Sequence, residues 1–339
     1  MNARTKMILG RMAQAIPVVM GVVVISFLLT RALPGDPAAY FAGPAADEAS
    51  IAEIREALGL DKPLFQQFFL YVGDLARGDL GTSLTTGQTV MSDLAARLPA
   101  SLELTLVALL LSCAIAIPLG VLAATRPGTW VDHLCRVLVT AGVSMPTFFT
   151  GIVLIYVFYY LAGLAPSPLG RLDVIYLSPP HVTGFYLIDA ALAGDWETWF
   201  GALKQLILPA TTLALFTLAP IARMTRAAML SALSSDFIRT ARAAGLGSRK
   251  VLYGYAFRNA LLPVVTTLGM VFSFTLGANV LVEKVFAWPG IGSYAVEALV
   301  VSDYAAVQGF VLAMALLFVA LNLVIDIAYA LIDPRIGLN

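Results

Sequence analysis

The residues able to do chemistry in this chain are few and scattered. His133 and His181 are its two histidines, and they fall in different loops, so they form no His/Cys cluster with metal-ligand spacing. The sequence contains no GxxxxGK[ST] phosphate loop, no GxSxG or HExxH motif and no Gly-rich dinucleotide fingerprint. We therefore expect no metal site, no cofactor and no catalytic residue in this chain.

One polar group near the C-terminus has two interpretations. Asn322, Asp326 and Tyr329 fall at positions i, i+4 and i+7, which places them on one face of a helix. A carboxylate inside a membrane helix is costly and often marks a proton relay, which would suit a proton-coupled secondary transporter. The structural alternative is that these side chains hydrogen-bond one helix to its neighbour.

A few other side chains are candidates for a transport pathway. Glu283 lies at the end of an apolar run, just before Lys284, where it could meet a substrate or form a local pair. Ser144, Met145 and Phe148 surround a proline, which tends to kink a helix. These four are candidate pathway-lining residues on position alone.

The most distinctive segment runs from Asp236 to Pro263, between two apolar runs. Between Arg223 and Arg258 there are seven basic residues and a single acid, Asp236. Such an excess of positive charge places a loop in the cytoplasm. A charged loop of this kind suits contact with a soluble partner.

The same segment predicts a helix, a turn and a second helix. Ser234, Ser235 or Asp236 can cap a helix start, and Gly245 can adopt the left-handed conformation that ends one. A second helical piece is expected to begin at Ser248, and Leu262–Pro263 is expected to mark the passage into the next apolar run.

Composition identifies an all-α integral membrane protein. The 339 residues are 59% hydrophobic and 12% charged, with a mean hydropathy of +0.86, which excludes a soluble globule. A spanning helix needs about 20 mostly apolar residues. Six candidates follow, at about 8–30, 103–125, 134–163, 206–230, 260–282 and 306–332. The first is too long for a signal-peptide core and is expected to remain as an anchor.

The distribution of charge gives the orientation. Basic residues at the N-terminus, at 126–136 and at 223–258 place these parts and both termini in the cytoplasm. The segments 34–99, 164–204 and 283–305 then face outward, and 34–99 is expected to contain two short amphipathic helices. Cys113 and Cys135 lie where no oxidising compartment would pair them, so we expect two free thiols. We expect one domain over 1–339.

Several motifs along the chain resemble one family. The motifs are DFIRTARAAGL from Asp236, RNALLPV from Arg258, PGDP (34–37), LGLDKP (58–63), GDLGTS (78–83), the Ser144–Met145–Pro146 turn, FAWPGIG (286–292) and DPR (333–335). Together they resemble the first permease subunit of dipeptide and oligopeptide ATP-binding-cassette importers. The resemblance covers nearly the whole chain.

The resemblance implies a six-helix permease of the type I importer fold, with a large periplasmic segment at 34–99 and a cytoplasmic coupling loop at 233–259. The implied partners are a second permease subunit, two cytoplasmic ATPases that bind ATP and Mg, and a periplasmic peptide-binding protein. By position, the residues expected to couple to an ATPase are Asp236, Arg239, Thr240, Ala241, Ala244, Gly245 and Leu246. The loop departs from the general family pattern, because no glutamate precedes the two alanines before the glycine.

The function implied is import of dipeptides or short peptides across the inner membrane, driven by ATP hydrolysis in partner chains. Oligopeptides, glutathione, nickel chelates and haem precursors are alternative cargoes of the same class. A proton-coupled carrier that uses Asp326 is the more distant alternative.

Overall fold

The computed structural model describes residues 3–32, 36–43, 46–57 and 59–332. These residues fall into two compact units. The first consists of residues 3–7, 99–289 and 321–332, and the second of residues 8–98 and 290–320, less the gaps above. The expectation of a single permease domain over 1–339 stays a prediction, and each unit is described by itself below.

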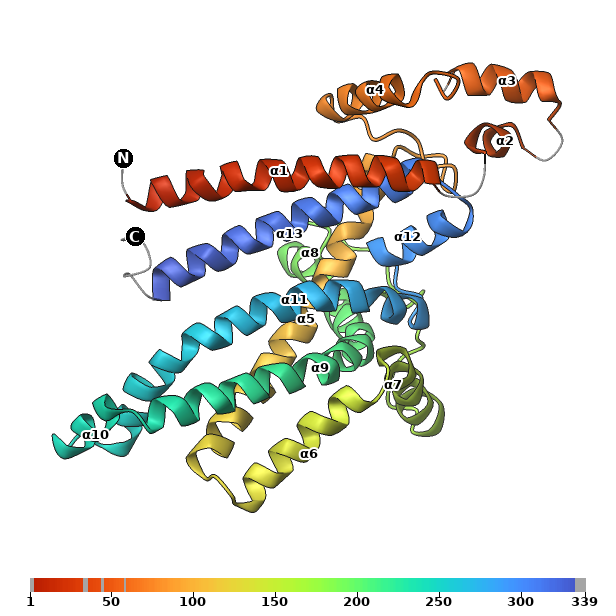
Figure 1. Cartoon of the computed structure of the whole chain (residues 1–339). Coiled ribbons are helices and arrows are strands. Elements are labelled where there is room, and N and C mark those ends of the chain that lie inside the picture. Colours follow the sequence, from red (N-terminus) through yellow and green to blue (C-terminus); the bar gives the residue numbers. More distant parts are fainter. Residues whose placement is uncertain (1–2, 33–35, 44–45, 58, 333–339) are drawn as a thin grey trace. The chain divides into compact units, whose positions relative to one another are not determined.

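The described residues are helical throughout, apart from turns, irregular loops and one isolated bridge between Thr82 and Thr89. Figure 1 shows the helices with their labels. In chain order they are α1 (Ala3–Ala32), α2 (Pro37–Ala42), α3 (Glu48–Ala57), α4 (Leu64–Ala76), α5 (Val90–Thr125), α6 (Trp130–Ser144), α7 (Thr147–Leu154), η1 (Ile155–Leu161), α8 (Tyr186–Ala193), α9 (Trp196–Leu233), α10 (Asp236–Ala243), η2 (Lys250–Phe257), α11 (Arg258–Val285), α12 (Ile291–Val300) and α13 (Tyr304–Ile332). The two η elements are π-helices.

Four stretches of the described chain are long and apolar enough to cross a membrane. They are Val90–Thr125, Trp196–Leu233, Lys250–Val285 and Tyr304–Ile325. Each contains or overlaps one of the spans expected from the sequence. Shorter apolar helices cover Ile16–Leu28, Thr147–Leu161 and Ile291–Val300.

The span expected at 134–163 is not one continuous helix. Helix α6 ends at Ser144, Met145 is extended with φ −111° and ψ 138°, and α7 begins at Thr147 after Pro146. A proline disfavours the helical conformation of the residue before it and removes a backbone donor, which explains the break. Pro118 lies inside the continuous helix α5.

The first unit is built around α9. Helices α9 and α11 lie side by side, and α6, α7 and α8 also contact α9 (Figure 1). Its core includes the buried side chains of Leu206, Leu213 and Ile221. A Cβ atom at Gly142 would lie 2.6 Å from the carbonyl oxygen of Leu215, so only glycine permits this approach of α6 to α9.

The second unit contains most of α1, the short helices α2, α3 and α4, the first turns of α5, and α12 with most of α13. The two amphipathic helices expected within 34–99 are present as α3 and α4. The buried Asp303 carboxylate accepts hydrogen bonds from the Ser83 hydroxyl at 2.7 Å and the Thr85 amide at 3.1 Å. These bonds attach the end of the GDLGTS motif to the start of α13.

Candidate functional site

Helix α10 has a defined start and a defined end. Ser235 occupies the N-cap position in an extended conformation, and Asp236 lies in the first turn, where a negative charge favours the helix dipole. At the other end, Gly245 has φ +75°. Its amide donates to the Arg242 carbonyl at 3.0 Å, and the Leu246 amide donates to the Ala241 carbonyl at 3.3 Å. This is the Schellman pattern that the glycine predicted.

One side of α10 is held by the unit's own core. Ile238 is fully buried and Ala241 nearly so. They belong to a cluster that includes Met229 from α9 and Val251 and Ala256 from the π-helix η2. The short helix therefore has a fixed position on the ends of α9 and η2, because its apolar residues pack there.

The residues of α10 other than Ile238 and Ala241 are exposed, as are Ala244 and Gly245. We name as the α10 face Asp236, Phe237, Arg239, Thr240, Ala244 and Gly245, with Phe237 on its flank, about 40° around the helix from the buried Ala241. The Arg239 guanidinium contacts the Asp236 carboxylate at 3.2 Å, so the main charged side chains of the face are paired at its start. Phe237 is 41% exposed although it is large and apolar.

The structure divides the seven residues expected to contact an ATPase. Five of them lie on the α10 face. Ala241 is buried against the cluster below the helix, and Leu246 is half-buried beside it. These two support the helix from within the chain. Phe237 was not selected from the sequence, although an apolar side chain two residues after a cap serine in a basic loop was a usable signal.

The chain after Gly245 also follows the prediction in part. A helix begins at Ser248, as expected. It does not stop before the next apolar run, because η2 passes directly into α11 and Pro263 lies inside that helix. The expected boundary at Leu262–Pro263 is therefore wrong. Pro263 lacks an amide donor, so the continuous helix loses one backbone hydrogen bond at this residue.

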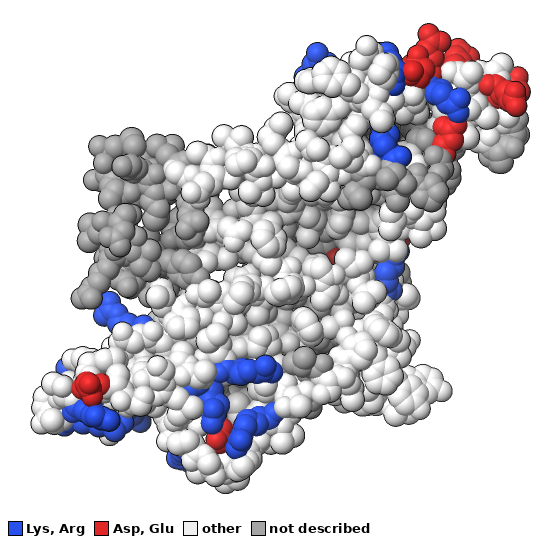
Figure 2. All heavy atoms as spheres, in the orientation of Figure 1, with Lys and Arg blue, Asp and Glu red and all other residues white. Residues whose placement is uncertain are grey.

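A hollow of about 530 Å³ lies beside α10. Its lining comes from the end of α5, the end of α9, α10 and η2, and includes Thr125, Leu233, Arg242 and Ser248. Lys and Arg side chains gather at the end of this unit that carries α10 and the turn before α6 (Figure 2). The α10 face thus belongs to a basic region.

Next to this region, an ion pair joins α6 to α9. The Arg226 Nε and Nη2 atoms donate to the two Asp132 carboxylate oxygens at 2.6 and 2.9 Å, and the Gly128 amide donates to the same carboxylate at 3.0 Å. The Arg226 guanidinium holds the pKa of Asp132 well below its usual range, because its hydrogen bonds stabilise the charged carboxylate. No local sequence pattern indicates this pair, because its members are 94 residues apart.

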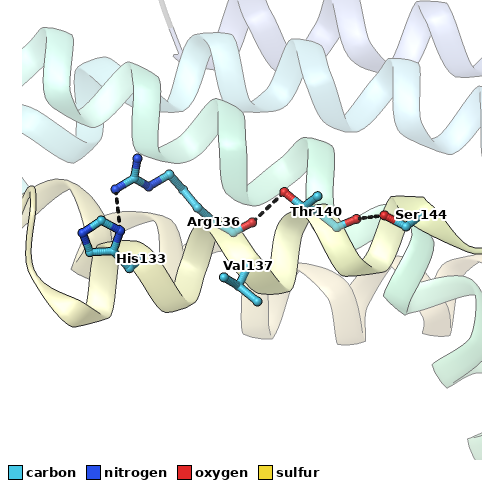
Figure 3. Close-up of a pocket in the computed structure, with 5 residues that line it drawn as sticks. All are labelled: His133, Arg136, Val137, Thr140 and Ser144. Atoms are coloured by element: carbon cyan, nitrogen blue, oxygen red, sulfur yellow. Dashed lines mark hydrogen bonds between the residues drawn. The ribbon is translucent and has the colours of Figure 1, made fainter.

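The candidate pathway residues occupy different environments. Ser144 lies on the exposed side of α6, where its hydroxyl donates to the Thr140 carbonyl (Figure 3). Met145 and Phe148 are also exposed. Glu283 is fully buried and accepts hydrogen bonds from the Ser101 hydroxyl and, at 3.0 Å, from the Asn279 amide group. The role of Glu283, whether in meeting a substrate or in a local pair, stays a prediction.

The polar residues near the C-terminus are described only in part. Asn322 is exposed on α13, and that helix continues to Ile332. The side chains of Asp326 and Tyr329 lie outside the described residues. Both the packing and the proton-relay interpretations stay predictions.

The potential metal and thiol ligands are dispersed. Cys113 is half-buried, Cys135 is buried, and both are free thiols. Within the part of the chain that the structure describes, no three His, Cys, Asp or Glu residues are grouped as metal ligands. His133 contacts the Arg136 guanidinium through Nδ1 at 2.9 Å, which is a polar surface contact.

Comparison with known proteins accounts for this combination of apolar helices and a basic loop. Residues 116–338 match the family described as binding-protein-dependent transport system inner membrane component. The chain belongs to this family. Residues 4–105 match the N-terminal region of membrane components of such systems.

Curated relatives of the permease cover nearly its whole length. It is 48% identical over 320 residues to the probable D,D-dipeptide transport system permease protein DdpB of Escherichia coli, covering 94% of each chain. It is 43% identical over 327 residues to the di/tripeptide transport system permease protein DppB of Pseudomonas aeruginosa, covering 96% of this chain and 97% of the relative. It is 40% identical to the dipeptide transport system permease protein DppB of Escherichia coli, covering 97% and 98%.

Membership defines the biochemical class. The permease is the non-catalytic inner-membrane component of an ATP-binding-cassette transporter that depends on a binding protein. ATP is bound by its ATPase partner, and the permease itself carries no cofactor. The resemblance read from the motifs is confirmed.

Proposed function

We propose that this permease imports dipeptides or short peptides across the inner membrane, and that the α10 face receives the ATP-driven movement. The complex contains a second permease subunit, two cytoplasmic ATPases and a periplasmic peptide-binding protein. The cargo follows from the relatives, whose names specify dipeptides, D,D-dipeptides or di- and tripeptides.

The proposed topology has six spans with both termini in the cytoplasm. Residues 34–99 form a periplasmic segment, and residues 233–259 form the cytoplasmic coupling loop. The excess of basic residues between Arg223 and Arg258 supports this orientation. The four long apolar helices, together with the shorter apolar helices Ile16–Leu28 and Thr147–Leu161, support the span count.

The observation that carries the coupling proposal is the two-sided packing of α10. Ile238 and Ala241 attach the helix to α9 and η2, so a push on the α10 face moves the ends of α9 and the η2–α11 helix with it. Phe237 offers an apolar contact and Arg239 a polar one on the side away from the core. An element that passes movement from an ATPase to the membrane helices needs one side packed against those helices and another side free to contact the ATPase.

The proposed cycle is alternating access. ATP binding brings the ATPases together, the coupling loops follow, and the helices shift as rigid bodies until the path opens outward. The binding protein delivers the peptide, and hydrolysis returns the path to the inward state. Cargo selectivity rests largely with the binding protein.

The test is dipeptide uptake by the complete complex in proteoliposomes, with its binding protein and ATPases. Uptake is expected to require ATP on the side of the membrane that carries the ATPases. It is also expected to continue when an uncoupler collapses the proton gradient while ATP is maintained. Uptake that stops with the gradient would contradict the proposal and favour a carrier that uses Asp326.

A further inference from the structure

The exposed side of α6 carries polar residues along one half and apolar residues along the other. His133, Arg136, Thr140 and Ser144 follow one another at spacings of three, four and four, which aligns them on one helical face. All four are exposed and point to the same side of the helix (Figure 3). We name these four residues the α6 stripe.

The buried side of α6 lies opposite. Cys135 and Val139 belong to the cluster shared with α9, and Asp132 pairs with Arg226. Leu134 is 44% exposed and lies about 100° around the helix from His133, beside the stripe rather than on it. Val137 is 63% exposed and lies four residues after His133, so it borders the stripe, and Leu134 lies further around the helix. The exposed surface of α6 therefore passes from polar to apolar through Val137.

A polar stripe on the outside of an apolar segment indicates an aqueous neighbour. Thr140 and Ser144 lie inside the span expected at 134–163, and His133 and Arg136 lie at its basic end. Polar side chains within spanning segments face a bundle interior or a water-filled cavity rather than lipid. The stripe lines a hollow of about 510 Å³ together with Val137. It also ends at Ser144, directly before the break at Met145–Pro146.

Arg136 is the charged group that the stripe presents. Its guanidinium is 3.7 Å from the Asp132 carboxylate, which is already hydrogen-bonded through both oxygens by Arg226. Its other polar contact is with His133. The guanidinium is half-exposed, so its donors can reach a carboxylate that arrives in the hollow.

Resting on the proposed function, we propose that the α6 stripe lines the path of the cargo and that Arg136 binds the C-terminal carboxylate of the peptide as it passes. A peptide carries a carboxylate at neutral pH, and an arginine matches that planar anion with two parallel donors. The complementary charge favours the cargo over an apolar partner surface on this side of α6.

The first experiment tests the aqueous neighbour. Thr140→Cys and Leu134→Cys are made in a Cys113→Ala, Cys135→Ala background, and the assembled complex is treated with a charged, water-soluble methanethiosulfonate. Because the reaction needs a hydrated thiolate, Thr140→Cys is expected to react about tenfold faster than Leu134→Cys. Leu134 lies nearer the helix start and hence nearer the proposed cytoplasmic side, so depth alone predicts the opposite order.

The second experiment tests Arg136. A dipeptide and its C-terminal amide are each loaded on the binding protein, and the ratio of their uptake rates is measured. Arg136→Gln is expected to lower this ratio about tenfold, and Arg136→Lys is expected to lower it much less, since a point charge still attracts the carboxylate. A ratio unchanged in Arg136→Gln would overturn the assignment.

The outcomes separate the inference from the proposed function. ATP-dependent dipeptide uptake by the unmodified complex tests the cargo, whereas the labelling order needs no cargo. If Arg136→Gln does not assemble, Arg136→Met removes the charge with an unbranched side chain and is expected to lower the ratio to the same extent, and the labelling order still tests whether the stripe faces water. Equal or slower labelling of Thr140→Cys would show that lipid or the second permease subunit covers the stripe, and would overturn the proposal.

Discussion

The first unit contains two ion pairs that join distant parts of the chain, and they differ in how completely they are enclosed. In the pair of Glu103 with Arg171, both side chains are nearly buried, at 4% and 6% exposed. In the pair of Asp132 with Arg226, the carboxylate is buried but the guanidinium is 26% exposed. The more enclosed pair attaches a loop to α5, and the more open pair joins α6 to α9.

The enclosed pair fixes a loop. The Arg171 Nη2 atom donates to Glu103 at 2.6 Å and to the Gly184 carbonyl at 2.8 Å, and its guanidinium lies over the Tyr186 ring. The Leu187 amide donates to the same carboxylate at 2.8 Å. Residues 171–187 are thereby attached to α5, which suits a fixed scaffold.

The more open pair joins two helices at the end that carries the basic loop. It is reachable by water, and it lies between the α6 stripe and the end of α9 that leads to α10. A partly hydrated ion pair can break and re-form at lower cost than an enclosed one. The comparison indicates a rigid attachment of residues 171–187 to α5 and a more adjustable link near α10.

The largest effect is expected from opening the enclosed pair. Arg171→Ala leaves the Glu103 carboxylate buried without its guanidinium, which costs about 3–5 kcal/mol of stability. Thermal unfolding of the purified complex measures this loss. Arg77→Ala removes an exposed arginine and is the control, with an effect of about 0.5 kcal/mol or less. Equal effects of the two substitutions would contradict the role of the pair.

The next effect concerns the two sides of α10. Ile238→Ala removes a fully buried side chain and is expected to cost toward the lower end of about 2–5 kcal/mol, because a short surface helix can relax around the cavity. Phe237→Ala, on the α10 face, is expected to leave stability within about 0.5 kcal/mol.

Transport assays are expected to show a defect in Phe237→Ala, the variant of the two that leaves stability nearly unchanged. Phe237→Ala is expected to reduce dipeptide uptake and the co-purification of ATPase while the permease stays folded in the membrane. Normal uptake and normal co-purification in Phe237→Ala would show that this side chain does not contact the ATPase.

The smallest effect is expected from the open pair, and it depends on pH. The pKa of Asp132 is lowered by Arg226, so the pair stabilises the protein above the unfolded carboxyl pKa of about 3.9 and loses that contribution as the pH falls toward the lower folded pKa. The stability difference between the wild type and Asp132→Asn is therefore expected to be constant from pH 8 to about 5. It should shrink below about pH 4; a difference that changes near pH 7 would contradict this assignment.

Local sequence signals predicted the shape of the segment around α10 well. Gly245 predicted the left-handed end of α10 and Ser248 predicted the next helix start, and the two amphipathic helices expected within 34–99 are α3 and α4. Each of these depends on a few neighbouring residues, so the information is present in the local sequence. The break at Pro146 follows in the same way from one proline.

Contacts between distant residues were not predictable in this way. Glu103 and Arg171 are 68 residues apart, and nothing in their local sequence indicates that they meet. The inward orientation of Ile238 and Ala241 depends on α9 and η2, which pack below them. The boundary at Pro263 was missed because the preceding π-helix η2 carries the chain into α11 without a turn.

The central claim is that the α10 face, held at its fixed angle by Gly245, transmits ATP hydrolysis to transport. The direct measurement is dipeptide uptake per ATP hydrolysed, in complexes with Gly245→Val and with the matched control Gly247→Val. Neither position has a neighbouring atom within 4 Å, but only Gly245 has a positive φ. The account predicts that Gly245→Val abolishes coupled uptake in an inserted permease and that Gly247→Val retains most of it, because valine resists the left-handed conformation. Full coupled uptake by Gly245→Val would contradict the account.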